Sequence, residues 1–490
     1  MKSTSGSFAE KSESHFEAVP RRSDVRRVFI ALALAACDKP AAAPHDSASS
    51  VSDSGSDSAS VSDSGSVPEA AAAAQIDPDG DDDPEDPGTG VRPTSGKFTR
   101  VGRTWLSLSR VCDLTVFDGA LYGAHAYAPL GVDGATITKY EHASESARAG
   151  DAGRATNKFS VAFDWNRPGE PAGGGGAGQG FVRVHAFSQK LWVADADPPY
   201  DGFGIVDQGT EGYVFVSDEH GVFAKAQNPA KADETERTKK VHFRPPKTAI
   251  IIPRAYHDID VIHFRGKTWA STGSVPPTER AWHGSSPGAL NALDEEKNRF
   301  QYVVGYPSDA NSDVWRLTYM VRFKDKLYAG IQEYYPRETN DFVVFDGTTL
   351  EGKRVTHGGG AETLRWYADR GSLYWITIDK DGHGALRVTR DGETWREIAL
   401  PSTAGRPADV VRFRDGLVVL AQHALMKLDV DGPAEGGTSQ ARTSTLTTIA
   451  TWDDKKLFAV DDIYCAPPLA VYDGDLYAGS QKDGALYRFE

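Results

Sequence analysis

The chain has 490 residues and a formal net charge of −15. This acidity excludes the usual nucleic-acid-binding classes, because phosphates require a basic protein surface. Three cysteines are too few for a disulfide framework in a chain of this length, and no run of about 20 apolar residues could form a mature membrane-spanning helix. Forty-nine glycines and many short apolar runs that end at Gly or Asp favour an all-β protein.

Residues 1–36 have the pattern of a signal peptide. A short apolar run, Val28–Ala36, follows arginines at positions 21, 22, 26 and 27. The run ends Leu-Ala-Ala-Cys, which resembles the bacterial lipobox. The resemblance implies cleavage before Cys37 and lipid attachment to its sulfur, which would anchor the protein to a membrane of the bacterial cell envelope. The alternatives are an ordinary cleaved signal, or a disordered leader in which Cys37 is incidental.

Residues 37–95 are predicted to form a disordered tether. Val51–Ser56 and Val61–Ser66 both read VSDSGS, and large apolar side chains are almost absent. Such a segment cannot bury enough apolar surface to offset its chain entropy. Alternating aspartates from Asp77 to Asp83 resemble a calcium loop faintly, but no glutamate stands at the closing position and prolines interrupt the run. We therefore expect an acidic linker, with no metal and no cofactor.

From about Val111 onward, two apolar runs joined by a short polar turn recur seven times. The clearest copy is the last, where Leu469–Tyr472 is followed by Asp-Gly and then Leu476–Gly479. The first runs of the other copies are Leu114–Phe117, Val184–Phe187, Val261–Phe264, Met320–Phe323, Leu364–Ala368 and Val410–Phe413. Successive copies lie 45 to 77 residues apart, enough for a four-stranded unit with insertions. Residues 96–490 are therefore predicted to form a seven-bladed β-propeller, with six or eight blades as alternatives.

One short motif has a known counterpart. Thr389–Trp395 reads TRDGETW and resembles the Asp box of sialidase-type propellers, a structural turn between outer strands. Thr99–Trp105 has a similar sequence but precedes the first repeat, and the last repeat reaches Glu490 without a fourth strand. We therefore expect Gly96–Leu108 to supply the outer strand of the last blade, which would close the ring and remove its open edges. The alternative is an edge strand on the first blade.

Two cysteines are predicted to pair. Cys112 precedes the first hairpin and Cys465 precedes the last, and a closed ring makes these two blades neighbours. The lipobox implies an oxidising compartment, so a Cys112–Cys465 disulfide is expected. The alternative is two unpaired buried thiols.

Six polar residues are candidates for a site at the mouth of the channel. The first strand of each propeller blade lines the central channel, and the residue four positions before each hairpin aromatic should lie where that strand begins. These positions hold Asp113, Arg183, Asp260, Tyr319, Arg365 and Asp409. Carboxylates, guanidiniums and a phenol on one mouth could bind a charged sugar or peptide. Sialidases need three converging arginines and this ring offers two. Solvation at the strand ends and a structural role are therefore expected here rather than a functional one.

Histidines and aspartates also gather in the sequence HDIDVIH. On a strand, His257 and His263 face one side while Asp258 and Asp260 face the other, so they are not expected to share a metal ion.

The expected function is that of a membrane-anchored envelope lipoprotein. Its propeller, in the periplasm or at the cell surface, would be a monomeric binding or scaffold module for an envelope protein or glycan. The Gly- and aromatic-rich insertions of the first three blades would form the contact surface. The alternative is a glycan-acting hydrolase or lyase that uses the channel-mouth residues. The sequence leaves the ligand open, and the presence of catalysis is uncertain but less expected than binding.

Overall fold

The computed structural model describes residues 87–106, 108–126, 135–142, 158–165, 180–196, 211–224, 246, 248–274, 287–306, 315–333, 340–430 and 444–490. All belong to one compact unit, Ala74–Glu490. The predicted signal peptide, Cys37, most of the predicted tether and large parts of the expected insertions lie outside the described residues. The described part contains strands and no helix, so it has no helix that could cross a membrane.

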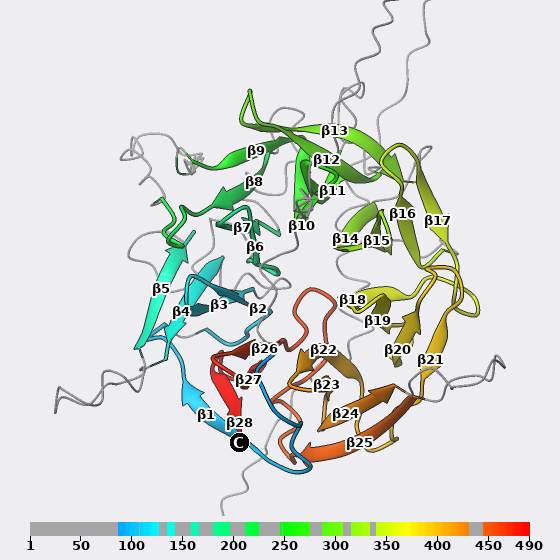
Figure 1. Cartoon of the computed structure of the whole chain (residues 1–490). Coiled ribbons are helices and arrows are strands. Elements are labelled where there is room, and N and C mark those ends of the chain that lie inside the picture. The colour runs from blue at the N-terminus through cyan, green and yellow to red at the C-terminus, as the bar shows by residue number, and fades with distance from the viewer. Residues whose placement is uncertain are drawn as a thin grey trace, which may run out of the picture. The chain divides into compact units, whose positions relative to one another are not determined.

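Five four-stranded sheets are arranged around a centre, as expected for a propeller-like fold (Figure 1). Within each sheet the strands are antiparallel. In four of these five sheets they follow one another in chain order from the centre to the rim, and the fifth takes its outermost strand from the other end of the compact unit. The first three sheets are β2 (Asp113–Phe117), β3 (Ala120–His125), β4 (Thr136–Glu141) and β5 (Lys158–Asp164); β14 (Trp315–Phe323), β15 (Lys326–Glu333), β16 (Phe342–Phe345) and β17 (Leu350–Lys353); and β18 (Glu362–Asp369), β19 (Ser372–Ile378), β20 (Gly384–Thr389) and β21 (Arg396–Ile398). The other two are β22 (Pro407–Phe413), β23 (Gly416–Ala421), β24 (Ala424–Val430) and β25 (Ser444–Thr451); and β26 (Leu469–Tyr472), β27 (Asp475–Gly479), β28 (Leu486–Phe489) and β1 (Phe98–Gly102).

The sixth sheet has eight strands, so the prediction of seven separate four-stranded blades is wrong. Its order is β10-β11-β12-β13-β9-β8-β7-β6. Two antiparallel runs of four strands meet where β13 and β9 pair in parallel, with Arg299 opposite Ile251. The strands are β6 (His185–Phe187), β7 (Lys190–Ala194), β8 (Glu211–Val216), β9 (Ile250–Pro253), β10 (Ala255–Phe264), β11 (Lys267–Ser274), β12 (Gly288–Asp294) and β13 (Arg299–Tyr306). The correction follows from this contact between two outer strands, which the repeat pattern does not encode.

Tight turns close the seven predicted hairpins. In the last hairpin, Asp473 and Gly474 have φ values of 52° and 75°, and Lys324 and Asp325 occupy the corresponding turn with 49° and 58°. Two left-handed residues in a row match the right-handed twist of the flanking strands, which is why Asp-Gly is a strong hairpin signal. The turn residues therefore explain why the hairpins could be placed from the sequence.

The strand β1 closes the last sheet, in the position that the sequence predicts. Phe98 pairs with Phe489 and Arg100 with Tyr487 in an antiparallel register. The Phe98 ring also packs edge-on against Phe489, Phe458 and Trp452. Segments from the two ends of the compact unit thus share one sheet, which leaves no open edge between its first and last repeats.

The two predicted partners, Cys112 and Cys465, form a disulfide. Their Sγ atoms are 2.05 Å apart, and both residues are buried. The bond joins the segment that leads into β2 to the segment that leads into β26. It therefore crosses the same junction that β1 closes.

Residues 87–95, which the sequence analysis assigns to the tether, contact the β22–β25 sheet. Arg92 is only 9% exposed. Its guanidinium bonds Asp415 and Asp429, and its Nη1 donates to the carbonyls of Leu417 and Leu428 at 2.7 and 3.0 Å. The described fold therefore includes residues before position 96.

The turn at Thr389–Trp395 is held by its own side chains. Asp391 Oδ1 accepts the amides of Glu393 and Thr394, and Thr389 Oγ1 accepts the amide of Gly392. Trp395 then packs against Phe342, Trp366 and Trp375. The similar sequence at Thr99–Trp105 behaves differently, because the Trp105 side chain is 83% exposed.

Candidate functional site

Irregular pairing in four innermost strands precedes the predicted channel residues. The register shifts between Asp258 and Asp260, Leu317 and Met320, Thr363 and Arg365, and Pro407 and Asp409. A bulge bends a strand and changes the direction of nearby side chains. The same local device therefore operates at four of the six predicted positions, and the simple alternation assumed from the sequence does not.

The three predicted aspartates connect successive repeats. Asp113 Oδ2 accepts the amide of Val184 at 3.0 Å, and Asp260 Oδ2 accepts the amide of Met320 at 2.7 Å. Asp409 Oδ2 accepts the amide of Leu469 at 2.8 Å. Val184 comes just before the innermost strand of the next repeat, Leu469 begins such a strand, and Met320 lies within one. Each carboxylate thus supplies an acceptor to a buried backbone N–H of the neighbouring repeat.

Arg365 lies between two of these carboxylates. Its Nη1 donates to Asp113 Oδ1 at 2.5 Å, and its Nε is 3.6 Å from Asp409 Oδ1. Its Nη2 donates to the Cys112 carbonyl at 3.1 Å. Burial alone would lower the pKa of Arg365, but Asp409 and Asp113 raise it above its ordinary value. The guanidinium therefore stays charged and lies between two buried carboxyl groups, of which Asp409 has its pKa raised by burial and lowered in part by Arg365.

The remaining predicted residues join the same cluster. Arg183 Nη1 is 3.5 Å from Asp113 Oδ1, and its guanidinium carbon is 5.4 Å from the centre of the Tyr319 ring. His185, which the sequence analysis did not select, places Nε2 2.6 Å from Asp260 Oδ1. Burial opposes ionisation of Asp260, but the charge and hydrogen bond of His185 hold its pKa below the usual value. With His185 protonated, three carboxylates face three cations.

The structure thus brings all six predicted residues together but does not expose them. Asp113, Asp260, Tyr319, Arg365 and Asp409 are each at most 5% exposed. The solvation part of the expectation for these polar positions is therefore wrong, whereas a structural role agrees with their bonds to neighbouring repeats. Contacts within the cluster and a covering segment satisfy them instead.

Residues 460–468, here called the mouth segment, cover the cluster. This segment leads into β26 and enters the centre of the ring (Figure 1, orange). Arg406 Nη1 donates to the Val460 carbonyl at 2.6 Å, Tyr319 Oη to the Ile463 carbonyl at 2.8 Å, and Arg365 Nη2 to the Ala466 carbonyl at 3.5 Å. The disulfide at Cys465 fixes the same segment. Donors from two innermost strands and from the residue before β22 therefore hold the backbone of the mouth segment.

A second polar group holds the side chain of Tyr464. Arg316 Nη1 donates to Tyr464 Oη and to Gln332 Oε1, while Tyr464 Oη donates to Gln332. Arg316 Nη2 donates to His257 Nε2 at 2.5 Å. Burial raises the pKa of Tyr464 above its ordinary value, so its phenol keeps its proton. Sequence reasoning missed Arg316, Gln332 and Tyr464, because none stands at the shared repeat position. It considered His257 only as a possible metal ligand and did not expect that role.

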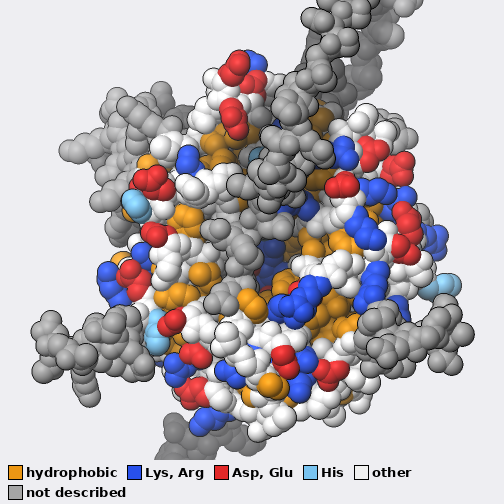
Figure 2. Space-filling model, in the orientation of Figure 1, with side chains coloured by type: hydrophobic (Ala, Val, Ile, Leu, Met, Phe, Trp, Pro, Cys, Tyr) orange, Lys and Arg blue, Asp and Glu red, His pale blue; other side chains and the backbone are white. Residues whose placement is uncertain are grey.

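Basic side chains are visible near the centre of the ring on the face drawn in Figure 2, with hydrophobic side chains among them. Acidic side chains on this face lie mostly toward the rim. The centre of this face therefore differs in charge from the chain as a whole, whose net charge is −15.

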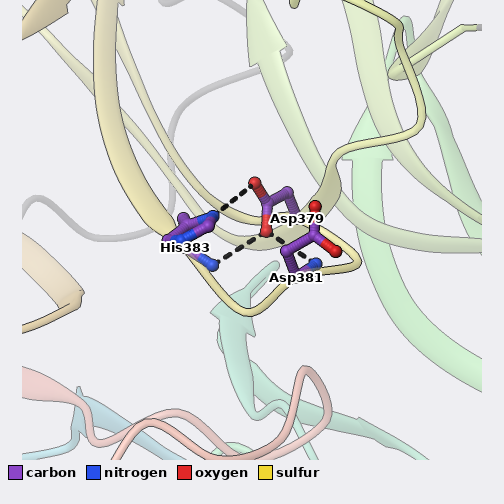
Figure 3. A group of neighbouring side chains, drawn as sticks. All are labelled: Asp379, Asp381 and His383. Atoms are coloured by element: carbon purple, nitrogen blue, oxygen red, sulfur yellow. Dashed lines mark hydrogen bonds and ion pairs between the residues drawn. The ribbon is translucent and has the colours of Figure 1, made fainter.

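One turn gathers three groups that could ligate a metal. Asp379, Asp381 and His383 lie close together between β19 and β20 (Figure 3). Asp379 Oδ1 accepts the amides of Asp381 and His383 at 2.9 and 2.8 Å, and the His383 side chain is 80% exposed. These bonds are those of an Asx turn, which accounts for the geometry without an ion. Elsewhere, the Asp258 carboxylate lies close to Gly212 of β8.

No family model matches the chain, and no curated protein matches it. Among solved structures, the chain is similar to virginiamycin B lyase from Staphylococcus aureus with quinupristin, at 10% identity and a TM-score of 0.45, covering 80% of this chain and 98% of that one. A periplasmic gluconolactonase from Pseudomonas aeruginosa matches at 12% identity and a TM-score of 0.37, covering 69% and 88%. A polysaccharide lyase matches at 10% identity and a TM-score of 0.39, covering 82% and 94%. Likeness at this level carries no argument about activity.

Proposed function

We propose that this protein is a lipid-anchored envelope protein whose propeller-like ring is a binding or scaffold module for an envelope protein or glycan. The observation that supports the proposal is that the channel carboxylates already bond the ring itself. In Asp113, Asp260 and Asp409, one oxygen accepts an amide of the next repeat, and the other contacts a cation or accepts an amide. These groups support the ring, and its outer surface is left for partners.

Catalysis by these residues is disfavoured by their burial and pairing. A glycosidase needs one carboxyl group that protonates the leaving oxygen and another that reaches the sugar or a water. Here Arg365 separates Asp113 from Asp409, and the mouth segment covers the cluster. A substrate would have to displace a disulfide-bonded segment before it met either carboxylate.

A glycan-acting hydrolase or lyase is the second candidate. It is favoured by the group of Arg316, His257 and Tyr464, which combines a cation, a proton acceptor and a phenol near the ring centre. Such a set could bind a sugar carboxylate and move a proton. This group is less deeply buried than the aspartates, since Arg316 and Tyr464 are partly exposed.

The two functions separate in one experiment. The full chain is applied to a glycan array and to a panel of fluorogenic glycosides, and uronate polymers are monitored for the unsaturated product of a lyase. We expect no turnover, and binding to a glycan or to an envelope protein. Turnover that is lost in Arg316→Ala and kept in Arg100→Ala, whose side chain lies at the rim with Asp483, would replace the binding function with the enzymatic one.

The anchor is tested separately. Cells that express the chain are labelled with an alkyne fatty acid. We expect incorporation in the natural chain and none in Cys37→Ser, which should also leave the membrane fraction. Equal labelling of the two proteins would refute the proposed anchor.

A further inference from the structure

We propose that the indole of Trp105, with the guanidinium of Arg103 beside it, binds an acidic sugar of an envelope glycan. The inference rests on the proposed binding function and assigns one class of ligand and one surface to it. It starts from an exposure, because Trp105 is 83% exposed, more than any other large hydrophobic residue in the part of the chain that the structure describes.

The segment that carries Trp105 is fixed on the turn between β27 and β28. Residues 103–111 lead from β1, at the rim, toward β2, near the centre of the ring (Figure 1). The Gly484 amide of the turn donates to the Ser109 carbonyl at 2.9 Å. Gly484 has a φ of 61°, and a Cβ at this position would clash with the carbonyl oxygen of Leu108. Glycine therefore permits the close approach of the two backbones.

Burial alternates along this segment and leaves Trp105 on the outside. Thr104 and Leu106 are 6% and 8% exposed, whereas Arg103 and Trp105 are exposed. The residues on both sides of the indole thus anchor its backbone in the fold. A platform that is already fixed loses little conformational entropy when a ligand binds, so Trp105 is prepared for a contact.

Arg103 supplies a positive charge next to the indole. Its Nη1 donates to the backbone carbonyl of Asp483 at 3.0 Å. The carboxylate of Asp483 bonds Arg100 and the Ala485 amide instead. A carbonyl oxygen carries no net charge, so the Arg103 guanidinium keeps its charge and further donors for an anion.

A single exposed indole beside an arginine suits a sugar better than a protein or a lipid surface. The apolar C–H face of a pyranose can lie flat on one aromatic ring, and a sugar carboxylate can accept the two parallel donors of a guanidinium. Protein hot spots and membrane-inserted surfaces need several apolar side chains side by side. The other exposed large hydrophobic residues of the described part lie elsewhere: Val91 precedes β1, Val222 follows β8 and Val303 lies in β13.

The test is titration calorimetry of the full chain with tetramers of glucuronate, galacturonate and mannuronate, and with their neutral carboxyl-reduced counterparts. We expect at least one acidic tetramer to bind, and its reduced form to bind more weakly. Trp105→Ala should weaken the binding of both forms by about tenfold, because the stacking surface is lost. Arg103→Gln should weaken only the acidic form, by about tenfold, because it removes the charge and keeps the indole.

Three further variants complete the test. Trp105→Phe keeps a smaller aromatic ring and should recover most of the affinity that Trp105→Ala loses. Lys297→Gln removes an exposed cation that pairs with Asp294, and Val303→Ala removes an exposed apolar side chain of β13. Both of these controls should bind the tetramers as the natural chain does. All variants change exposed residues, so their thermal midpoints should match that of the natural chain.

Unchanged affinity in Trp105→Ala would overturn the inference and leave glycan binding intact. Equal losses for the acidic and reduced forms in Arg103→Gln would overturn the assignment of an acidic sugar. Binding of no tetramer would also refute the site, whether the chain then captures an envelope protein or binds phosphatidylglycerol vesicles through Trp105. Failure of the proposed function gives a different result, in which the natural chain binds neither a glycan nor an envelope protein.

Discussion

The sharpest test of the buried cluster is the removal of Arg365. Arg365→Ala leaves Asp113 and Asp409 without the guanidinium that lies between them. Removing one partner of a buried ion pair lowers the free energy of unfolding by about 3–5 kcal/mol. Arg183 remains near Asp113, so we expect a loss of about 3 kcal/mol. Arg365→Lys keeps the charge but loses the bidentate reach to both carboxylates, so a loss of about 1–2 kcal/mol is expected.

The assay is urea unfolding followed by tryptophan fluorescence and near-ultraviolet circular dichroism. Arg100→Ala, which breaks an exposed pair with Asp483, is the matched control and should stay within about 0.5 kcal/mol of the natural chain. The deficit of Arg365→Ala should shrink as the pH falls from 8 to 5. Buried carboxylates that lose their cation have raised pKa values in the folded state, so protonation relieves them. A loss below about 1 kcal/mol, or a deficit independent of pH, would refute the structural interpretation of the cluster.

Three further outcomes are expected. Arg92→Ala should cost about 2 kcal/mol in the same unfolding assay, because it removes a buried cation that bonds two carboxylates and two carbonyls; an unchanged midpoint would show that residues 87–95 do not stabilise the fold. Deletion of residues 96–108 should lower the thermal midpoint far more than deletion of residues 38–86, because only the first removes β1 from the β26–β28 sheet; equal effects would contradict closure by β1. Burial lowers the pKa of His125 to about 4, so the folded chain resists a proton that the unfolded chain accepts below about pH 6.5. Stability should therefore fall by up to about 3 kcal/mol between pH 6.5 and 4, and a His125→Gln variant that keeps the whole of this fall would exclude His125 as its source.

The hairpins were accessible from the sequence because their signals are local. Alternating apolar residues and turns such as Asp473-Gly474 act over a few positions, and the left-handed φ values of that turn match the expected hairpin type. The pairing of β1 with β28 is long-range, yet it could be predicted because the last repeat lacked a fourth strand and the first repeat had a spare one. Closure of the ring favoured this pairing over an edge strand on the first blade.

The eight-stranded sheet and the docking of Arg92 could not be inferred in this way. Arg92 lies in a segment whose composition is that of a linker, and its partner Asp415 is 323 residues away. The parallel contact of β13 with β9 rests on a single registered pair, Arg299 and Ile251. Neither contact produces a periodic pattern in the sequence. Both depend on how the folded sheets pack against their neighbours.

The sequence selected six residues that meet in the structure, but it did not predict that they would be buried. Position relative to the hairpin aromatic was enough to select six residues that meet. Exposure could not be inferred, because it depends on the mouth segment, whose residues Ile463 and Ala466 cover the cluster with their carbonyls. The bulges before Asp260, Arg365 and Asp409 were also hidden, since each is a change of register and not of composition.

The equivalent positions differ between repeats for a physical reason. A carboxylate at this position satisfies the amide of the next repeat, but seven carboxylates around one centre would repel one another in a medium of low dielectric constant. The other positions hold Arg183, Tyr319 and Arg365 instead of aspartate, and the two arginines lie against Asp113. The cluster behaves as one unit. Removing a carboxylate leaves a buried amide without its acceptor, and removing an arginine leaves a buried carboxylate without its cation. Repeats that look degenerate as a sequence pattern are therefore complementary as a charge pattern.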